Sequence, residues 1–247
     1  MYHEISLSLH RPVLKEQIMK RRFLLSSIVL VLVFSSTIQA QDQDGGSFLK
    51  KMEQMLSQMT DEQKAYARAN WLEAPVPYTR KHDHPFAYMV LPNPAPDTQT
   101  GVECSGCSSA YLLRFYGEKV NGVELYHQST FPSKHEGGAY PKCFKILFEQ
   151  QYKNYTTEYY TGTTEDLKDA ISQGIPVIVL LFTGQSLHYV PVVGYDDNHF
   201  YIQDSVEKYR NVPEHAAYNE AIDIAKFDAM WNIPIESCQR LFVVVRK

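Results

Sequence analysis

The sequence predicts an α+β domain in which helices come first and an antiparallel sheet follows. Up to residue 172 the apolar residues recur mainly at helical spacing. Beyond it, strand patterns follow one another at 176–182, 188–195 and 199–204. The connections between these runs are short, as in antiparallel hairpins, whereas parallel strands need a long crossover. The chain of 247 residues, 44% of them hydrophobic, is long enough to bury one substantial core or two small ones.

Residues 1–40 have the features of a secretory signal peptide. Basic residues at 20–22 precede a short apolar run at 23–34, and a small residue, Ala40, closes the segment. Translation from Met19 would place the basic residues at the start of the chain. The apolar run is too short for a comfortable membrane span, and an uncleaved anchor is the alternative. We therefore expect a secreted or periplasmic protein that is not stably inserted in a membrane after signal cleavage.

Residues 41–98 are predicted to form a helical and proline-rich lead-in to the main domain at 99–247. Apolar residues at helical spacing predict one helix over 47–59, and the capping pattern that begins at Thr60 predicts another from there. Six prolines in 74–101 predict an extended, loop-rich chain. We expect the lead-in to be integral to the fold because it is short. A removable pro-segment that covers the cleft is the alternative.

Local signals divide the main domain into its elements. Small residues followed by an apolar face predict a helix from Cys104 to Tyr116 that ends at Gly117. Threonine and acidic residues at 164–166 predict the start of a helix that Gly174 closes. The other predicted elements are a short helix at 123–128, a helix at 142–151, a strand at 155–160 and a last strand at 241–245.

A cysteine at the start of a helix is the first candidate for chemistry. Backbone N–H groups and the helix dipole at such a position favour a thiolate over a thiol, so Cys104 is placed where a nucleophilic cysteine would be. His188 begins the second predicted strand, and Asp204 ends the third, sixteen residues later. The start of one strand of an antiparallel hairpin lies beside the end of the next, so we expect these two side chains to be neighbours. Asp204 would then orient the imidazole of His188, whose other nitrogen would face Cys104, in the manner of a catalytic triad.

Other interpretations of these residues stay open. Cys104 and Cys107 also form a C-x-x-C pattern, which is typical of thiol-disulfide proteins, but the strand and helix order of such proteins is missing here. A buried cysteine in a helix is commonly inert packing, and His188 in an apolar strand could be a core residue. Export would expose all four cysteines to oxidising conditions. A disulfide between Cys143 and Cys238 is one option, and the sequence leaves the pairing of these and of Cys107 undecided.

Two stretches resemble the bacterial C39-like cysteine peptidases, a branch of the papain-like group. Residues 104–117 are similar to the nucleophile helix of that family, with a cysteine, small residues, an alanine, and then apolar residues and an aromatic pair before glycine. From Gly174 to Asp204 the order is also similar: a glycine and a proline that open a strand, a histidine that starts the next, a Val-Gly-Tyr-Asp turn and a final aspartate. Phe227 and Trp231 resemble the family's late aromatic pair.

The resemblance, which covers about residues 99–245, implies a papain-like cysteine peptidase fold with N-terminal helices packed on an antiparallel sheet. It implies that Cys104 is the nucleophile, His188 the base and Asp204 the residue that orients the base. The oxyanion-hole glutamine of the family usually lies six residues before the cysteine. Gln99 lies five residues before Cys104, so it would fill this role only if the loop were shifted by one residue.

The sequence thus predicts an exported cysteine hydrolase, most simply a peptidase that acts on peptide or protein substrates through Cys104, His188 and Asp204. No cofactor or metal is implied. The formal net charge of -4, without a basic patch that carries aromatic residues, argues against nucleic acid as a partner. A non-catalytic papain-like module that keeps the cleft for peptide recognition is the alternative, ahead of a thiol-disulfide protein. The sequence leaves the cleavage specificity and the oligomeric state open.

Overall fold

The computed structural model describes residues 57–71, 75–81, 86–92, 94–135, 137–184, 186–206, 218–233, 235 and 237–247. The predicted signal peptide and most of the helix predicted at 47–59 lie outside these residues. Within the described part of the chain, every helix is too short or too polar to cross a membrane.

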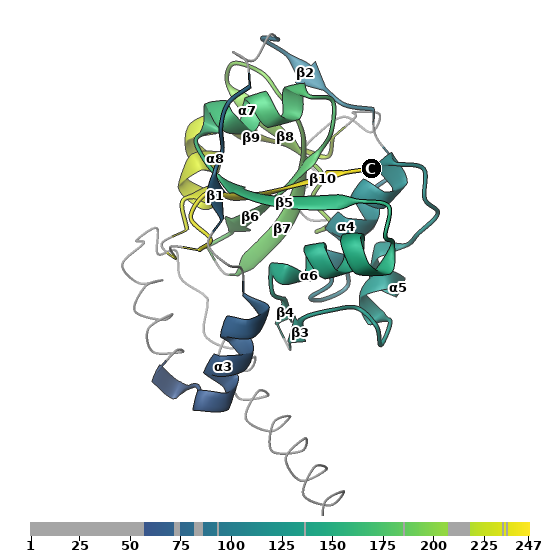
Figure 1. The fold of residues 1–247 in the computed structure, drawn as a ribbon. Coiled ribbons are helices and arrows are strands. Elements are labelled where there is room, and N and C mark those ends of the chain that lie inside the picture. The colour runs from purple at the N-terminus through teal and green to yellow at the C-terminus, as the bar shows by residue number, and fades with distance from the viewer. Residues whose placement is uncertain are drawn as a thin grey trace, which may run out of the picture. The chain divides into compact units, whose positions relative to one another are not determined.

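One eight-stranded sheet forms the centre of the domain (Figure 1). Its strands are β1 (Val76–Pro77), β2 (Met89–Val90), β5 (Thr156–Thr161), β6 (Val177–Phe182), β7 (Leu187–Tyr195), β8 (His199–Ile202), β9 (Glu220–Asp223) and β10 (Leu241–Arg246). They lie in the order β1-β5-β10-β6-β7-β8-β9, with β2 also paired to β7. All pairings are antiparallel except that of β1 with β5.

Helices cover both faces of this sheet, as the alternation of side chains along β6 indicates. Ile178 and Leu180 belong to one apolar cluster, and Val177 and Val179 belong to the other. The first cluster includes residues of α4 (Cys104–Phe115), α5 (Gly122–His127), α6 (Lys142–Lys145) and the π-helical segment Ile146–Gln151. The second includes residues of α7 (Thr164–Ser172) and α8 (Ile224–Trp231).

The α+β class and the antiparallel hairpins predicted from the sequence are confirmed, with local differences. The predicted elements do not include α8, β9 or the two-residue strands β1, β2, β3 (Lys134–His135) and β4 (Gly138–Ala139). The helix predicted at 142–151 is present, but its second half has π-helical hydrogen bonding. The strand predicted at 199–204 ends at Ile202, so Asp204 lies two residues beyond β8.

Two glycines allow α5 to pack directly against the first turn of α4. A Cβ added at Gly106 would lie 2.5 Å from the carbonyl oxygen of Gly122, and one added at Gly122 would lie 2.5 Å from the Cα of Cys107. Real Cβ atoms are not found at such distances, so both positions need glycine for this contact. The close approach fixes the start of α4, where Cys104 lies.

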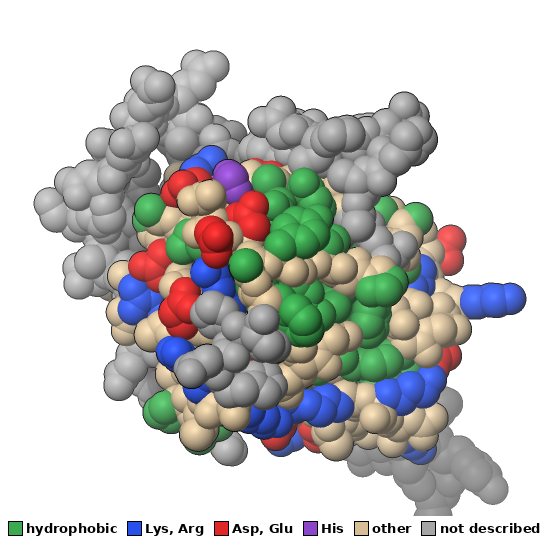
Figure 2. All heavy atoms as spheres, turned by 90° about the horizontal axis from the view of Figure 1, so that it is seen from above, with side chains coloured by type: hydrophobic (Ala, Val, Ile, Leu, Met, Phe, Trp, Pro, Cys, Tyr) green, Lys and Arg blue, Asp and Glu red, His purple; other side chains and the backbone are tan. Residues whose placement is uncertain are grey.

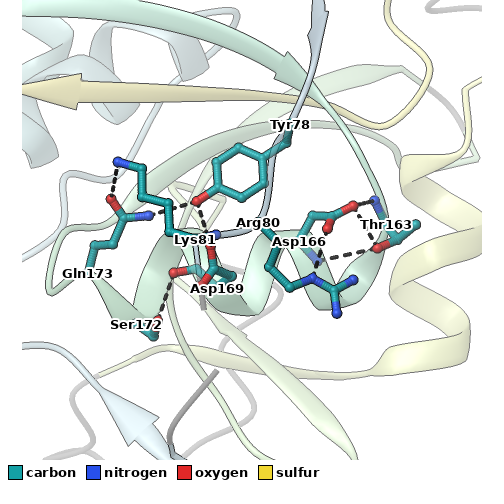
Figure 3. Close-up of polar contacts among 8 residues, drawn as sticks. All are labelled: Tyr78, Arg80, Lys81, Thr163, Asp166, Asp169, Ser172 and Gln173. Atoms are coloured by element: carbon teal, nitrogen blue, oxygen red, sulfur yellow. Dashed lines mark hydrogen bonds and ion pairs between the residues drawn. The ribbon is translucent and has the colours of Figure 1, made fainter. Parts of the chain in front are cut away.

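The chain around β1 is attached to the sheet and to α7 (Figure 3). The hydroxyl of Tyr78 donates to the Oδ2 atom of Asp169 at 2.8 Å, and the backbone N–H of Lys81 donates to the same oxygen at 3.0 Å. The Nε2 atom of Gln173 donates to the Tyr78 hydroxyl at 2.7 Å. The Asp169 side chain belongs to a fully buried residue, so these bonds replace water at a carboxylate.

The helix α3 (Asp61–Asn70) begins where the capping pattern predicts. The backbone N–H of Thr60 donates to Oε1 of Gln63 at 2.8 Å, and the backbone N–H of Gln63 donates to Oγ1 of Thr60 at 3.2 Å. The Tyr66 ring packs edge-on against Tyr140, with ring centroids 6.1 Å apart. Tyr140 lies between the small hairpin of β3 and β4 and the start of α6, so α3 contacts the chain that leads into α6.

The surface seen in Figure 2 carries charges of both signs. Acidic and basic side chains interleave on the described part of this face, and apolar side chains gather beside them. Phe86 and Tyr88 are half or more exposed, at 50% and 61%.

Candidate active site

Cys104 is the first residue of α4, and its side chain faces the interior of the domain. The residue is 7% exposed, and it belongs to the apolar cluster between α4 and the sheet. One turn further along the helix, the hydroxyl of Ser108 donates to the backbone carbonyl of Tyr189 at 3.0 Å. Since Tyr189 follows His188 in β7, this buried hydrogen bond ties the helix that carries the cysteine to the strand that carries the histidine.

His188 and Asp204 are neighbours, as the hairpin pattern predicts. The Nε2 atom of His188 lies 2.9 Å from Oδ1 of Asp204, and both residues are buried, at 5% and 4% exposed. The backbone N–H of Val206 donates to the same Oδ1 atom at 2.6 Å. The pairing of β7 with β8 shifts register between Val192 and Gly194, and it brings the chain beyond β8 alongside the first half of β7.

The environment of His188 favours a charged imidazole. Burial by itself lowers the pKa of His188, but hydrogen bonds to Asp204 and to Cys104, together with the charges of these two partners, raise it to about 10. Because Nε2 faces Asp204, Nδ1 is the ring nitrogen left for Cys104. A protonated histidine between a carboxylate and a sulfur is the arrangement that stabilises a thiolate–imidazolium pair.

Gln99 lies in the loop before α4, and its contacts hold it to two other segments. Its Nε2 atom donates to the carbonyl oxygen of Gly101 at 2.8 Å. Its Oε1 atom accepts from the hydroxyl of Ser205 at 2.6 Å, and its backbone N–H donates to the Ser205 carbonyl at 2.9 Å. Gln99 is therefore held by Ser205, the residue that follows Asp204, and by the backbone of Gly101.

All four cysteines are described, and each is a buried free thiol. Burial and the nearby Asp97 carboxylate raise the pKa of the Cys107 thiol to about 12. Burial also raises the pKa of Cys143, well above its ordinary value, and that of Cys238, to about 12. The disulfide considered between Cys143 and Cys238 is therefore not formed in this structure.

Three polar residues near the site were not among the sequence candidates. The amide of Asn219 holds the backbone of Asp204 on both sides: Nδ2 donates to its carbonyl at 2.6 Å, and Oδ1 accepts from its N–H at 2.7 Å. Glu220 follows in β9, where burial and the Asp204 charge raise its pKa to about 7. Glu103, directly before the cysteine, is 3% exposed. Its position beside Cys104 is the one signal in the sequence that could have singled it out.

In the described part of the chain, no three histidine, cysteine or acidic side chains are grouped to hold an ion. The groups that the described site brings together are a cysteine sulfur, a buried histidine that can hold a proton, and a carboxylate that fixes its ring.

Comparison with known proteins adds a family match. The model of a family described as Peptidase_C39 like matches residues 73–233, which is most of the chain and includes Cys104, His188 and Asp204. No curated protein matches.

Several solved structures are similar to this chain. One is a protein from Bacillus anthracis described as a C39-like peptidase, at 17% identity and a TM-score of 0.49, over 65% of this chain and 98% of that one. Another is the peptidase domain of Streptococcus ComA, a bifunctional ABC transporter, at 16% identity and a TM-score of 0.47, over 61% and 96% of the two chains.

Proposed function

The chain belongs to the Peptidase C39-like family, and on that premise we propose that it is an exported cysteine peptidase acting through Cys104, His188 and Asp204. The observation that carries this proposal is that the buried His188 side chain contacts both Asp204 and Cys104. His188 is hydrogen bonded to Asp204 at 2.9 Å through one ring nitrogen and contacts Cys104 as well. The class of substrate is a peptide or protein, in keeping with the family.

The proposed reaction begins with the sulfur of Cys104 as a thiolate and His188 as an imidazolium. The thiolate attacks the carbonyl carbon of the scissile peptide bond, and the carbonyl oxygen becomes an oxyanion. When the intermediate collapses, the C–N bond breaks and His188 gives its proton to the leaving amine. The neutral His188 then takes a proton from water, whose oxygen attacks the thioester, and the Cys104 thiolate leaves as the carboxylic acid product is released.

Asp204 serves this cycle by fixing the ring. Its Oδ1 atom accepts from Nε2 of His188, which directs Nδ1 toward the sulfur, and the N–H of Val206 holds that oxygen in place. The oxyanion would be met by the backbone N–H of Cys104 at the start of α4 and by the side chain of Gln99. An amide nitrogen carries two hydrogens, so Nε2 of Gln99 can keep its bond to Gly101 and still donate to the oxyanion.

The alternative of a dithiol protein receives no support from Cys107. A thiol with a pKa raised to about 12 stays protonated at neutral pH, and it is a poor partner for thiol-disulfide exchange. A catalytic site with one reactive cysteine is the simpler account of Cys104 beside His188.

Alkylation and peptide cleavage together test the enzyme proposal. Iodoacetamide labelling of Cys104 is measured against pH in the wild type and in His188→Ala, and cleavage of a mixed peptide library is followed by mass spectrometry. We expect cleavage to be lost in Cys104→Ala and His188→Ala and to survive in Cys107→Ser. Labelling that is unchanged by His188→Ala, with no cleavage by the wild type, would favour a peptide-binding module. Loss of function in Cys107→Ser would favour a dithiol protein.

Export is the part of the proposal that rests on residues 1–40 alone. We expect the mature chain to begin at Gln41 and to be found outside the cytoplasm. N-terminal sequencing of protein recovered from the medium or from the periplasmic fraction measures both. A first residue within the apolar run, or retention of the whole segment in the membrane fraction, would contradict it.

A further inference from the structure

The carboxylate directly before the nucleophile collects an unusual number of donors. The Oε2 atom of Glu103 accepts from the backbone N–H of Gly101 at 2.6 Å and from that of Thr100 at 3.2 Å. Its Oε1 atom lies 2.9 Å from Nε2 of His127 and 3.3 Å from the hydroxyl of Thr100. Glu103 is 3% exposed, so a single buried side chain organises the backbone of the loop that leads into α4.

These bonds keep Glu103 ionised. Burial alone would raise the pKa of Glu103, but the hydrogen bonds from His127, Gly101 and Thr100 lower it below its usual value. A buried carboxylate with this many donors holds its partners more firmly than a neutral acceptor would, because charge-assisted hydrogen bonds are roughly twice as strong.

The charge of Glu103 has no evident use in the attack itself. A carboxylate next to the sulfur opposes, by Coulomb's law, any negative charge that develops on that atom. The value of this side chain therefore has to lie in the geometry that it imposes. The loop segment that Glu103 holds lies between Gln99 and Cys104.

The contact that reaches Gln99 passes through Gly101. Glu103 fixes the N–H of Gly101, and the carbonyl of the same residue accepts from Nε2 of Gln99 at 2.8 Å. A displacement of Gly101 would thus turn the amide of Gln99. On the far side of the carboxylate, His127 comes from α5, whose close packing on α4 is set by glycine.

We propose that Glu103 is a positioning residue that sets the oxyanion side of the site by holding the backbone of Thr100 and Gly101. The inference rests on the proposed function, since it assigns Gln99 and the Cys104 N–H to the oxyanion. Glu103 acts through the loop and touches no substrate. His127 is its outer partner, with a side chain that is 61% exposed.

Two thiol reagents separate an oxyanion effect from an effect on the sulfur. Iodoacetamide alkylates Cys104 by displacing iodide, and no oxyanion forms. p-Nitrophenyl acetate acylates the same sulfur: the C–S bond forms, an oxyanion appears, and p-nitrophenolate leaves. Both rate constants are measured on the full mature protein, with Cys104→Ala as the blank and Glu124→Ala, an exposed carboxylate on α5, as the matched control.

In Glu103→Ala we expect acylation to fall about 10-fold or more, while alkylation changes by less than about 3-fold. Full loss of one oxyanion donor costs about 100- to 1,000-fold, and here the donor is displaced rather than removed. Glu103→Gln should recover most of the acylation rate, since its amide oxygen accepts the same two backbone N–H groups. Glu124→Ala should leave both rates unchanged. If Glu103→Ala does not fold, Glu103→Asp carries the same expectation, because the shorter side chain falls away from Gly101.

Two results would overturn the assignment of Glu103. One is acylation and alkylation falling by the same factor, which would place the effect on the sulfur or on the fold. The other is an acylation rate that stays at the wild-type value in a folded Glu103→Ala. Failure of the proposed function has a different signature: both rates would be insensitive to His188→Ala, whatever the Glu103 variants do.

Discussion

Tyr78→Phe tests whether the chain around β1 is part of the folded domain. The change removes one oxygen and keeps the ring, which packs on Tyr160 and Phe242 with centroid distances of 5.0 and 5.4 Å. The lost hydroxyl donates to the buried carboxylate of Asp169 and accepts from Gln173 (Figure 3). Burial and the Asp169 carboxylate raise the pKa of Tyr78, so the hydroxyl remains a donor throughout the working pH range.

The loss in the free energy of unfolding depends on which polar groups lose a hydrogen-bond partner in Tyr78→Phe. A hydrogen bond to a charged group contributes about 1.5–3 kcal/mol, and a buried acceptor left unpaired carries its desolvation cost. Asp169 keeps the backbone N–H of Lys81. The Nε2 atom of Gln173 loses the hydroxyl as its acceptor, while its Oε1 atom still accepts from Lys81 and Arg246. We therefore expect Tyr78→Phe to lower the free energy of unfolding by about 2 kcal/mol.

Urea unfolding of the mature protein, followed by tryptophan fluorescence and by circular dichroism, measures this loss. With a slope of about 2 kcal/mol/M, the midpoint should fall by about 1 M at unchanged slope. Tyr88→Phe is the matched control, since Tyr88 is 61% exposed and its ring alone packs on Tyr201. A loss below about 0.5 kcal/mol, or an equal loss in Tyr88→Phe, would refute the reasoning and favour a lead-in that can be removed.

Three further changes probe the surroundings of the site. Asn219→Ala should lower kcat for peptide cleavage about 10-fold, with little change in KM, because the Asp204 backbone loses both of its contacts with the Asn219 amide. Steady-state kinetics measure both constants, and an unchanged kcat would contradict the prediction. Gly106→Ala should destabilise the fold by about 2 kcal/mol or more in urea unfolding, because the new methyl group meets Gly122, and a neutral effect would contradict the packing. The folded-state pKa of Glu220 is raised from 4.5 to about 7, so wild-type stability should fall as pH rises through this window. Between pH 5 and 8, the free energy of unfolding should decrease by about 1 kcal/mol less in Glu220→Gln than in the wild type. Urea unfolding at several pH values measures this, and equal pH profiles for the two proteins would contradict it.

The hairpin of His188 and Asp204 could be predicted because its signals are local. Short, nearly continuous apolar runs define β7 and β8, and turn residues join them, so the neighbourhood of the two side chains follows from chain order alone. The start of α4 is equally local, since small residues and Gly117 bound an apolar stretch.

The missed elements depend on contacts that no local pattern records. β1 and β2 have two residues each, and they are strands only because a longer strand lies beside them. The helix α8 has eight residues, and its start depends on Asp223, whose carboxylate accepts from two backbone N–H groups. The π-helical segment arises within a stretch whose spacing predicts an ordinary helix, and spacing does not distinguish the two hydrogen-bond patterns.

The same reasoning explains why the supports of the site escaped prediction. Asn219 acts on Asp204 from fifteen residues away, from the position just before β9, and nothing in its own surroundings marks it. Gln99 is out of the usual register by one residue in the sequence. In the structure its position is set by Ser205, more than a hundred residues further along the chain. Long-range hydrogen bonds of this kind are decided by the folded chain, so a single sequence carries no pattern for them.

Ser205 connects the two sides of the proposed site, the one that holds Asp204 and the one that holds the oxyanion. Ser205 follows Asp204 directly, and it holds Gln99 through both the backbone and the side chain. A shift of Asp204 should therefore disturb the imidazole and the oxyanion loop together, whereas a shift of Gly101 should disturb the loop alone. The two supports then differ in effect: loss of the Asn219 amide should lower both alkylation and acylation of Cys104, and loss of the Glu103 carboxylate should lower acylation. If the two residues support different parts of the site, the two substitutions will affect alkylation and acylation differently. If the site is simply destabilised by any substitution, both rates will fall together in both variants.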